Sequence, residues 1–169
     1  MNNNLVYLGI GGNLGSVLPR LKDALHALSM QPAVSQLTIS RFYRSAPFQM
    51  SSQHWFINAV CSFLTSLSPT EVFKMTQAIE KEFGKTLQEK NQDRNIDIDF
   101  LFYGTHFYKD HELEIPHPRW RERLFVLKPL ADLTSEIILR HHGKTIRYYI
   151  PDFIHPLADH SCQIISLIT

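Results

Sequence analysis

Apolar and polar residues in the first part of the chain are arranged in a way that predicts a strand, a glycine-rich turn and a helix. Residues 5–10 form a short apolar run of strand-forming residues, and the glycine-rich segment 11–15 follows directly. The helix is indicated by leucines at steps of three and four residues: Leu18, Leu21, Leu25 and Leu28. This spacing turns one apolar stripe toward a core.

Three more segments have the composition of strands. Residues 34–43 and 56–64 are rich in β-branched and aromatic residues, and a polar loop that contains proline joins them. Residues 96–103 first alternate between apolar and acidic side chains and then become apolar. We expect these segments to form one sheet with the first strand.

A second helix is predicted from Ser68 onward. Ser68, Pro69 and Glu71 have the spacing of a helix start, with an N-cap serine, a proline at the first helical position and a glutamate three residues after the cap. We expect the helix to run to about Phe83, because Gly84 stops it.

The rest of the chain is less regular. The segment 84–95 is polar and lacks periodicity, so we expect a loop that closes over a substrate, with a simple surface connection as the alternative. A proline-rich loop, a short helix and a less regular C-terminal third follow the last strand. Strands interleaved with two clear helices favour an α+β or α/β sandwich, with helices on a mostly antiparallel sheet.

Composition narrows the class of protein. A chain of 169 residues, 44% of them hydrophobic, is expected to form a single domain over residues 1–169. Seventeen basic and sixteen acidic side chains give a formal charge of +1, so no nucleic-acid or membrane partner is expected. No apolar stretch reaches the roughly 20 residues of a membrane span, and no signal-peptide pattern opens the chain. Cys61 and Cys162 have no paired spacing, and we expect plain thiols in a cytoplasmic protein.

Asp97 and Asp99 are the first candidates for a metal site. They are two residues apart in a predicted strand, so both carboxylates project from one face while the apolar neighbours take the other. Two parallel oxygen ligands suit one or two magnesium ions that bridge a polyphosphate. The alternative is an amphipathic edge strand with a solvated acidic face, because short motifs recur by accident.

Basic residues on both sides of this pair favour phosphate binding. Arg94 precedes the pair, and a second group follows it: His117, Arg119, Arg121 and Arg123. Guanidinium groups bind phosphate oxygens through two parallel hydrogen bonds and neutralise negative charge. Alternatively, this second group is a solvated basic turn with Glu122 as a partner, and His117 is a packed loop residue.

Two other features are less specific. The segment 11–15 lacks the lysine and hydroxyl residue of a P-loop as well as the dinucleotide-binding spacing, so a tight turn is its expected role. Asn58 interrupts an apolar run, and an inward-pointing asparagine needs partners for its amide. A flat heterocycle with an amino-oxo edge would supply them, and so would the backbone.

Six segments, taken in order, resemble the 6-hydroxymethyl-7,8-dihydropterin pyrophosphokinases. They are GIGGNLG at 9–15, FYRSAP at 42–47, FINAV at 56–60, QAIE at 77–80, RNIDIDFLFYG at 94–104 and IPHPRWRERLFVLKPL at 115–130. The resemblance implies a ferredoxin-like α/β/α sandwich with helices on both faces of the sheet and mobile loops over the active site. It also implies transfer of diphosphate from ATP to the hydroxymethyl group of the pterin, with release of AMP, in folate biosynthesis.

The resemblance also implies a role for each matching residue. Catalysis would rest on Arg94, Asp97 and Asp99, and the two aspartates would hold two Mg²⁺ ions on ATP. The residues that would bind ATP are Gln77, Glu80, Lys85, Arg94, His117, Arg119, Arg121 and Arg123. The residues that would bind the pterin are Ser45, Pro47, Phe48, Phe56, Asn58, Asp97 and Phe125, with Phe56 and Phe125 on the two faces of the ring.

The chain departs from the family pattern at a few positions. Gln92 and Asp93 stand where the family usually has Gly-Pro before the arginine, and Asn91 stands where the family can have a tryptophan. Phe56 replaces a common tyrosine. Residues 86–87 occupy a stretch that often contains a second arginine, for which Arg119 or Arg121 would compensate.

Two rival functions stay open on the sequence. A catalytically impaired nucleotide-binding module of the same fold would bind ATP without releasing AMP. A structural or interaction domain would use Asp97 and Asp99 only as an acidic strand face. Because some family members are fused to the next enzyme of the pathway, covalent or non-covalent association with dihydropteroate synthase is a further expectation. The apolar segment 163–169 is then either an edge strand or a cut within a longer protein.

Overall fold

The computed structural model describes residues 3–49, 52–85 and 92–157. Residues 86–91, half of the predicted loop over 84–95, lie outside these ranges, and so does the apolar segment 163–169. The predictions for these two segments are therefore not tested by the described residues.

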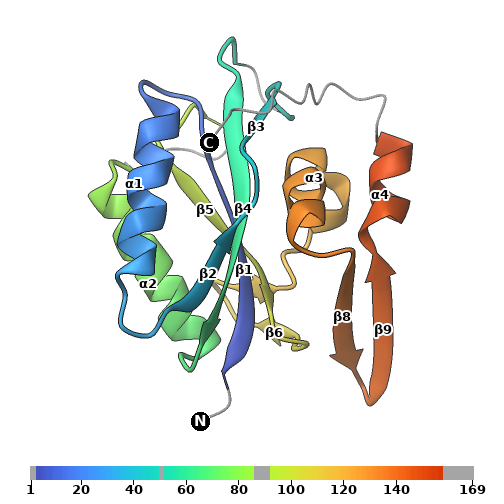
Figure 1. The fold of residues 1–169 in the computed structure, drawn as a ribbon. Helices are drawn as coiled ribbons and strands as arrows, with labels where there is room; N and C mark the ends of the chain where they lie inside the picture. The colour runs from blue at the N-terminus through green and yellow to red at the C-terminus, as the bar shows by residue number, and fades with distance from the viewer. Residues whose placement is uncertain (1–2, 50–51, 86–91, 158–169) are drawn as a thin grey trace.

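A five-stranded antiparallel sheet forms the centre of the molecule (Figure 1). The strand β1 (Asn4–Gly12) lies between β4 (Phe56–Thr65) and β5 (Asp97–Tyr103). On its other side β4 pairs with β2 (Ser35–Ile39) and β3 (Tyr43–Ser45), which follow one another along it. All of these pairs are antiparallel, as the sequence predicted.

Helices cover both faces of the sheet, which confirms the predicted sandwich (Figure 1). The helices α1 (Val17–Ser29) and α2 (Pro69–Glu82) lie on one side. The helices α3 (Leu124–Leu133) and α4 (Ile150–Leu157) lie on the other.

The predicted start of α2 is confirmed in detail. The Ser68 hydroxyl accepts a hydrogen bond from the Glu71 backbone N–H at 3.4 Å, and Glu71 Oε2 accepts one from the Ser68 backbone N–H at 2.8 Å. This reciprocal capping box satisfies two of the backbone donors that a helix start leaves free.

The prediction of one strand over residues 34–43 was wrong, because the segment is divided into β2 and β3. The Ser40 backbone N–H donates to the Val60 carbonyl, and the Ser40 hydroxyl accepts from the Val60 N–H, both at 2.9 Å. A side chain thus takes the place of a backbone acceptor at this point. Gln36, with a φ of 54°, adds a register shift in β2.

The C-terminal third is more regular than predicted. Short elements complete the described chain: β6 (Tyr108–Lys109), β7 (Glu114–Ile115), the 3-10 turn η1 (Trp120–Glu122), β8 (Glu136–His141) and β9 (Lys144–Tyr149). The strands β8 and β9 form a hairpin whose two turn residues, His142 and Gly143, have φ values of 48° and 75°. Two-residue turns of this kind usually contain Asn-Gly or Asp-Gly, so the His-Gly pair gave little indication of a hairpin in the sequence.

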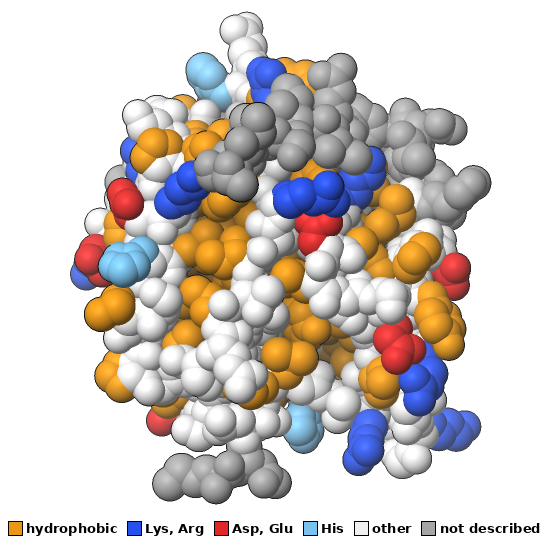
Figure 2. Space-filling model, in the orientation of Figure 1, with side chains coloured by type: hydrophobic (Ala, Val, Ile, Leu, Met, Phe, Trp, Pro, Cys, Tyr) orange, Lys and Arg blue, Asp and Glu red, His pale blue; other side chains and the backbone are white. Residues whose placement is uncertain are grey.

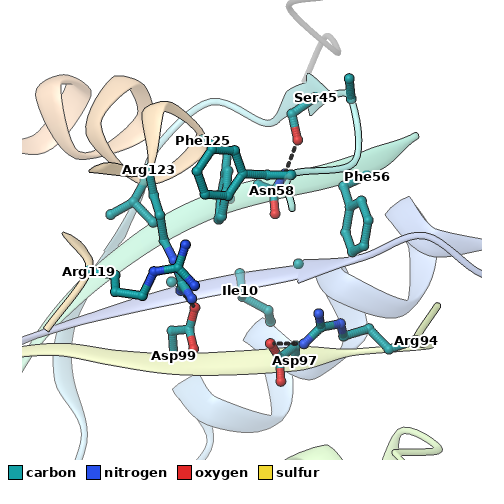
Figure 3. A pocket seen from close by; sticks show the side chains of 16 residues that line it. Ile10, Ser45, Phe56, Asn58, Arg94, Asp97, Asp99, Arg119, Arg123 and Phe125 are labelled. Atoms are coloured by element: carbon teal, nitrogen blue, oxygen red, sulfur yellow. Dashed lines mark hydrogen bonds and ion pairs between the residues drawn. The ribbon is translucent and has the colours of Figure 1, made fainter. Parts of the chain in front are cut away.

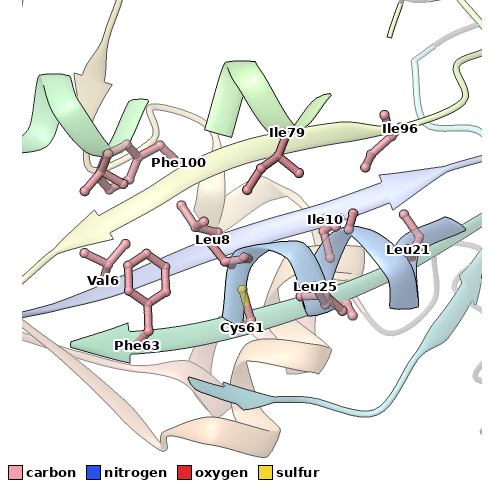
Figure 4. Close-up of a cluster of buried hydrophobic side chains, with 14 of the residues drawn as sticks. Val6, Leu8, Ile10, Leu21, Leu25, Cys61, Phe63, Ile79, Ile96 and Phe100 are labelled. Atoms are coloured by element: carbon pink, nitrogen blue, oxygen red, sulfur yellow. The ribbon is translucent and has the colours of Figure 1, made fainter. Parts of the chain in front are cut away.

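Two hydrophobic layers hold the helices on the sheet. On the α1 and α2 side, Val6, Leu8 and Ile10 of β1 are almost completely buried (Figure 4). Three leucines of the stripe predicted for α1, Leu21, Leu25 and Leu28, pack there, whereas Leu18 is only half-buried and Val17 is buried beside them. On the α3 side, a second cluster includes Leu101 and Trp120. These two layers bury most of both faces of the sheet, so a binding site can form only where they leave part of a face uncovered.

The thiol of Cys61 lies within the first of these layers. It is free and buried, and burial raises its pKa to about 12. A thiol in this environment stays protonated at neutral pH and behaves as a small apolar side chain.

Charged side chains occur in separate groups on the face shown in Figure 2. Basic and acidic side chains are found together toward the top and again over the β8–β9 hairpin at the lower right (Figures 1 and 2). No helix among the described residues is both long and apolar enough to cross a membrane.

An ion pair fastens the β3 region to helix α3. The Arg41 guanidinium and backbone N–H donate to the Asp132 carboxylate, the latter at 3.0 Å, and the buried Tyr43 hydroxyl donates to it at 2.9 Å. Burial opposes ionisation of Asp132, but hydrogen bonds from Arg41 and Tyr43 outweigh it and lower the pKa below the ordinary 3.8.

We expect Asp132→Asn to lower the free energy of unfolding by about 1–3 kcal/mol at pH 7, because Arg41 and Tyr43 lose a charged acceptor. Since the folded pKa of Asp132 is lowered, its contribution is present above pH 3.8 and is lost as the pH falls through the folded pKa. The difference between the two proteins in chemical denaturation should therefore shrink in acid. Glu136→Gln, which removes the exposed pair with Arg147, is the control and should change stability by less than about 1 kcal/mol. A constant difference from pH 7 to pH 2 would contradict this account.

Candidate active site

The central strand β1 creates the floor of a pocket through two glycines. In the sheet register Gly11 lies opposite Asn58 on β4 and opposite Asp97 on β5, and Gly9 lies opposite Asp99. A side chain at position 11 would meet the Asn58 amide, since an added Cβ would stand 2.3 Å from its Oδ1. The glycines therefore leave open space between polar groups of the neighbouring strands.

Aromatic and amide groups form one part of this pocket. Asn58 is buried, and its Nδ2 donates to the Ser45 hydroxyl at 2.8 Å. Phe56 and Phe125 lie on opposite sides of Asn58 (Figure 3). Phe48 meets Phe125 edge-on, with ring centroids 6.0 Å apart. This part of the pocket combines hydrogen-bonding groups with flat apolar walls, which suits a planar polar ring.

Each aspartate of β5 is paired with an arginine (Figure 3). Arg94 Nη1 lies 2.6 Å from Asp97 Oδ2, and Arg123 Nη1 lies 2.6 Å from Asp99 Oδ2. Within the described residues, the Nε atoms of both arginines are buried and have no hydrogen-bond partner. Buried donors in this state are unusual in native proteins, and they suit a site that takes up an additional acceptor such as a phosphate oxygen.

The two arginines also contact the aromatic walls. The Arg94 guanidinium carbon lies 5.8 Å from the centroid of Phe56, and that of Arg123 lies 5.6 Å from the centroid of Phe125. A cation over a ring face is attracted to it, so these contacts couple the charged part of the pocket to its aromatic part.

Lys85 links a third carboxylate, that of Glu80, to the two aspartates of the site. Its Nζ lies 3.0 Å from Asp97 Oδ1 and 2.6 Å from Glu80 Oε1. Glu80 is buried, and it also accepts from the Ile98 backbone N–H at 2.6 Å. Burial raises the pKa of Glu80, against the opposing effect of these donors. Glu80 thus anchors α2 to the strand that bears both aspartates.

His117 faces Asp99 in its neutral form. Its Nδ1 accepts a hydrogen bond from the Arg119 backbone N–H at 3.1 Å, and its Nε2 lies 3.9 Å from Asp99 Oδ1. Burial lowers the pKa of His117 below 6.5, although Asp99 opposes the shift. With Nδ1 acting as acceptor, the proton of the neutral ring belongs on Nε2, toward the carboxylate.

The structure brings most of the predicted site residues together. Those that line the pocket are Ser45, Phe48, Phe56, Asn58, Arg94, Asp97, Asp99, Arg119, Arg123 and Phe125. Glu80, Lys85 and His117 contact its aspartates or their strand, and Pro47 lies in the lining loop between Ala46 and Phe48.

Two predicted residues lie elsewhere. Gln77 is exposed on α2, and the Arg121 guanidinium lies against the rings of Trp120 and Tyr148, at 5.8 and 5.3 Å from their centroids. Neither lines the pocket among the described residues.

The glycine-rich segment has a different role from the predicted tight turn. Gly11 and Gly12 belong to β1, and only Gly15, with a φ of 66°, supplies left-handed backbone to the turn. At Gly12 an added Cβ would stand 2.4 Å from the Asn95 backbone oxygen. The glycines themselves can be read in the sequence, but the sequence does not show that Asn58 and Asn95 of neighbouring segments lie against them.

Asn13 is a buried residue that the sequence did not single out. Its Nδ2 donates to Asp93 at 2.6 Å, its Oδ1 accepts from the Arg94 N–H at 2.8 Å, and its own N–H donates to the Arg94 carbonyl at 3.0 Å. Asn13 therefore holds the backbone of Arg94 in place. Asp93, one of the departures from the family pattern, takes part in this network.

The aspartate pair fits magnesium. No group of three metal-binding side chains occurs within the described residues. Magnesium nevertheless is commonly held by one or two carboxylates together with substrate phosphates and water, and Asp97 and Asp99 offer such hard oxygen ligands. Lys85, Arg94 and Arg123 surround them with groups suited to phosphate oxygens.

Comparison with known proteins agrees with this chemistry. Residues 7–135 match the 7,8-dihydro-6-hydroxymethylpterin-pyrophosphokinase (HPPK) family. The chain is 35% identical over 135 residues to a 2-amino-4-hydroxy-6-hydroxymethyldihydropteridine pyrophosphokinase of Bacillus subtilis, which covers 80% of this chain and 81% of that protein. It is 36% identical over 154 residues to the folic acid synthesis protein fol1 of Pneumocystis carinii, covering 91% of this chain but 21% of that protein.

The fold also has a solved counterpart. A Plasmodium falciparum HPPK-DHPS crystallised with pterin and p-hydroxybenzoate superposes with a TM-score of 0.66 at 13% identity. The similar region covers 92% of this chain and 43% of that chain. The chain thus spans less than half of this structure and about a fifth of the fungal protein.

The crowding at Gly12 leads to a prediction about stability. We expect Gly12→Ala to destabilise the fold by about 2–4 kcal/mol, because its Cβ would meet the backbone of Asn95 and the neighbour cannot rotate away. Gly9→Ala is the matched control on the same strand, since an added Cβ there makes ordinary contacts of 3.7 Å. It should cost less than about 1 kcal/mol in urea denaturation. Equal losses for both variants would refute the close approach.

Proposed function

The chain belongs to the 7,8-dihydro-6-hydroxymethylpterin-pyrophosphokinase family and is therefore an ATP-dependent pyrophosphokinase of folate synthesis; from this premise we propose how its pocket holds both substrates. The reaction moves a diphosphate group from ATP to the hydroxymethyl group of 6-hydroxymethyl-7,8-dihydropterin and releases AMP. The observation that carries the proposal is the pair of aspartates beside an aromatic pocket, each held by an arginine. Family membership disfavours the rival reading as an impaired nucleotide-binding module.

The pterin occupies the part of the pocket around Asn58. Phe56 and Phe125 cover the two faces of the ring, and the Asn58 amide and Ser45 hydroxyl bind its amino-oxo edge. This assignment is supported by the burial of Asn58 and by the flat walls on either side of it. Phe48 and Pro47 contribute the apolar loop that adjoins Phe125.

The triphosphate of ATP lies across the aspartates. Asp97 and Asp99 would hold two magnesium ions, which would neutralise the charge of the phosphates. Arg94, Arg123 and Lys85 bind phosphate oxygens, a role supported by the two buried guanidinium nitrogens without a partner within the described residues. The predicted roles of Gln77, His117 and Arg121 toward ATP stay predictions.

Catalysis is mainly a matter of position and charge. The hydroxymethyl oxygen of the pterin attacks the β-phosphorus in line and forms a new P–O bond, while the bond from this phosphorus to the oxygen bridging the α- and β-phosphates breaks. AMP leaves with that oxygen, and the hydroxyl proton passes to solvent. Arg94 and Arg123 are placed to stabilise the charge that develops on the oxygens.

Two broader expectations stay proposals. The likeness to HPPK-DHPS supports a covalent or non-covalent association of this chain with dihydropteroate synthase. We also propose that the protein is located in the cytoplasm, as expected from the sequence.

The first test is product analysis with substituted aspartates. Purified protein with ATP, magnesium and the hydroxymethyl-pterin should form AMP in proportion to the diphosphorylated pterin. Asp97→Asn and Asp99→Asn should each lower kcat by at least about 100-fold, because each removes a charged metal ligand, while the fold is retained. Asp152→Asn makes the same chemical change at an exposed position on α4 and should leave kcat unchanged. ADP as the product, or near-normal rates for the two variants, would contradict the proposal.

A second test concerns the amide in the pocket. Gly11→Ala should push the Asn58 side chain away from Ser45 and raise the dissociation constant of the pterin by about tenfold or more. Binding of a non-hydrolysable ATP analogue should change by less than about twofold, because the side chain of Asn58 is bound to Ser45 whereas the aspartates are bound to Lys85, Arg94 and Arg123. Both constants can be measured by fluorescence titration. Unchanged pterin affinity would remove Asn58 from the site.

A further inference from the structure

Arg119 makes contacts unlike those of the other arginines in the pocket. It lies before η1, and its side chain reaches a loop 70 residues earlier in the sequence. The guanidinium donates a hydrogen bond to Oε1 of Gln49, and its carbon lies 5.7 Å from the centroid of Phe48. Arg119, Phe48 and Gln49 together are called the Arg119 clasp.

The clasp lies at the rim of the pocket. Arg119 and Phe48 both line the pocket, yet their exposed fractions are 38% for the Arg119 side chain and 40% for Phe48. Phe48 in turn meets Phe125, with ring centroids 6.0 Å apart. A continuous row of contacts therefore runs from Arg119 through Phe48 to Phe125, and it joins two loops across the aromatic part of the pocket.

The partners of Arg119 also separate it from the phosphate-binding arginines. Arg94 and Arg123 are each bound to an aspartate at 2.6 Å and are more buried. Arg119 contacts a ring and a neutral amide, and within the described residues its ion-pair partner is the exposed Glu122 at 3.5 Å. Since Arg94 and Arg123 also lie over phenylalanine rings, what distinguishes Arg119 in the described part of the chain is its hydrogen bond to a neutral amide in place of an ion pair with an aspartate.

We propose that Arg119 is a positioning residue for pterin binding, which helps to retain the pterin by holding Phe48 against Phe125 at the pocket rim. This inference rests on the proposed function and assigns Arg119 to the pterin, whereas the sequence grouped it with ATP. The guanidinium orders a half-exposed phenylalanine that would otherwise be free to rotate, so the pocket closes on a flat ring. Gln49 fixes the guanidinium in the orientation that this contact needs.

The test compares Arg119→Ala with Arg44→Ala. Both variants remove one positive charge and one cation–π contact, since Arg44 lies 4.5 Å from the Trp55 ring, but Arg44 does not line the pocket among the described residues. Stopped-flow fluorescence gives the dissociation rate and affinity of 6-hydroxymethyl-7,8-dihydropterin without ATP. A separate titration gives the affinity of α,β-methylene-ATP with magnesium and without pterin.

We expect Arg119→Ala to raise the dissociation rate and the dissociation constant of the pterin by about tenfold and to leave the ATP analogue within about twofold. Arg44→Ala should change neither. Arg119→Lys keeps the charge but loses the planar group, and it should recover only part of the pterin affinity.

Weaker binding of the ATP analogue with unchanged pterin binding would make Arg119 a phosphate ligand and overturn the inference. Equal pterin binding by Arg119→Ala and the unaltered protein would overturn it as well, and would leave the proposed function intact. An unaltered protein that binds no pterin, either alone or together with the ATP analogue and magnesium, would instead overturn the proposed function together with the inference.

Discussion

The site depends on one constraint, the placement of small residues on the central strand. Side chains of β1 alternate between the two faces of the sheet, so Val6, Leu8 and Ile10 bury themselves under α1 and α2. On the opposite face Gly9 and Gly11 add no side chain, and the neighbouring strands present their polar groups across the gap. One face of β1 thus packs against the helices, and its other face forms the floor of the pocket.

The charges in the pocket are balanced before any substrate binds. The carboxylates of Asp97, Asp99 and Glu80 all have basic partners from the protein itself. A charge left without a partner in a half-buried site is costly, which explains why each carboxylate is held in this way. On binding of ATP and magnesium, Arg94 and Arg123 would exchange a carboxylate for a phosphate oxygen, and the aspartates would exchange a guanidinium for the metal. Neither step leaves a buried charge unpaired.

The sequence predicted the elements that local patterns determine. The leucine stripe of α1, the capping box at Ser68 and the alternation in β5 are all short-range signals, and the family resemblance placed most of the site residues. Local patterns could not predict the division of residues 34–43 into two strands, because the hydrogen bonds between Ser40 and Val60 join segments 20 residues apart. The role of Gly11 was missed for the same reason, since it follows from the register of three strands.

The precision of the site rests on contacts outside the pocket. Asn13 fixes the backbone of Arg94, and Asp132 holds the β3 region, which carries Ser45, on helix α3, which carries Phe125. Neither residue contacts the pocket floor, yet each sets the position of residues that do. Because a buried asparagine or an ion pair of this kind has few alternative arrangements, the backbone of Arg94 and the β3 region are held in place by the fold itself. Strengthening such links is therefore expected to stabilise the fold and the geometry of the site together.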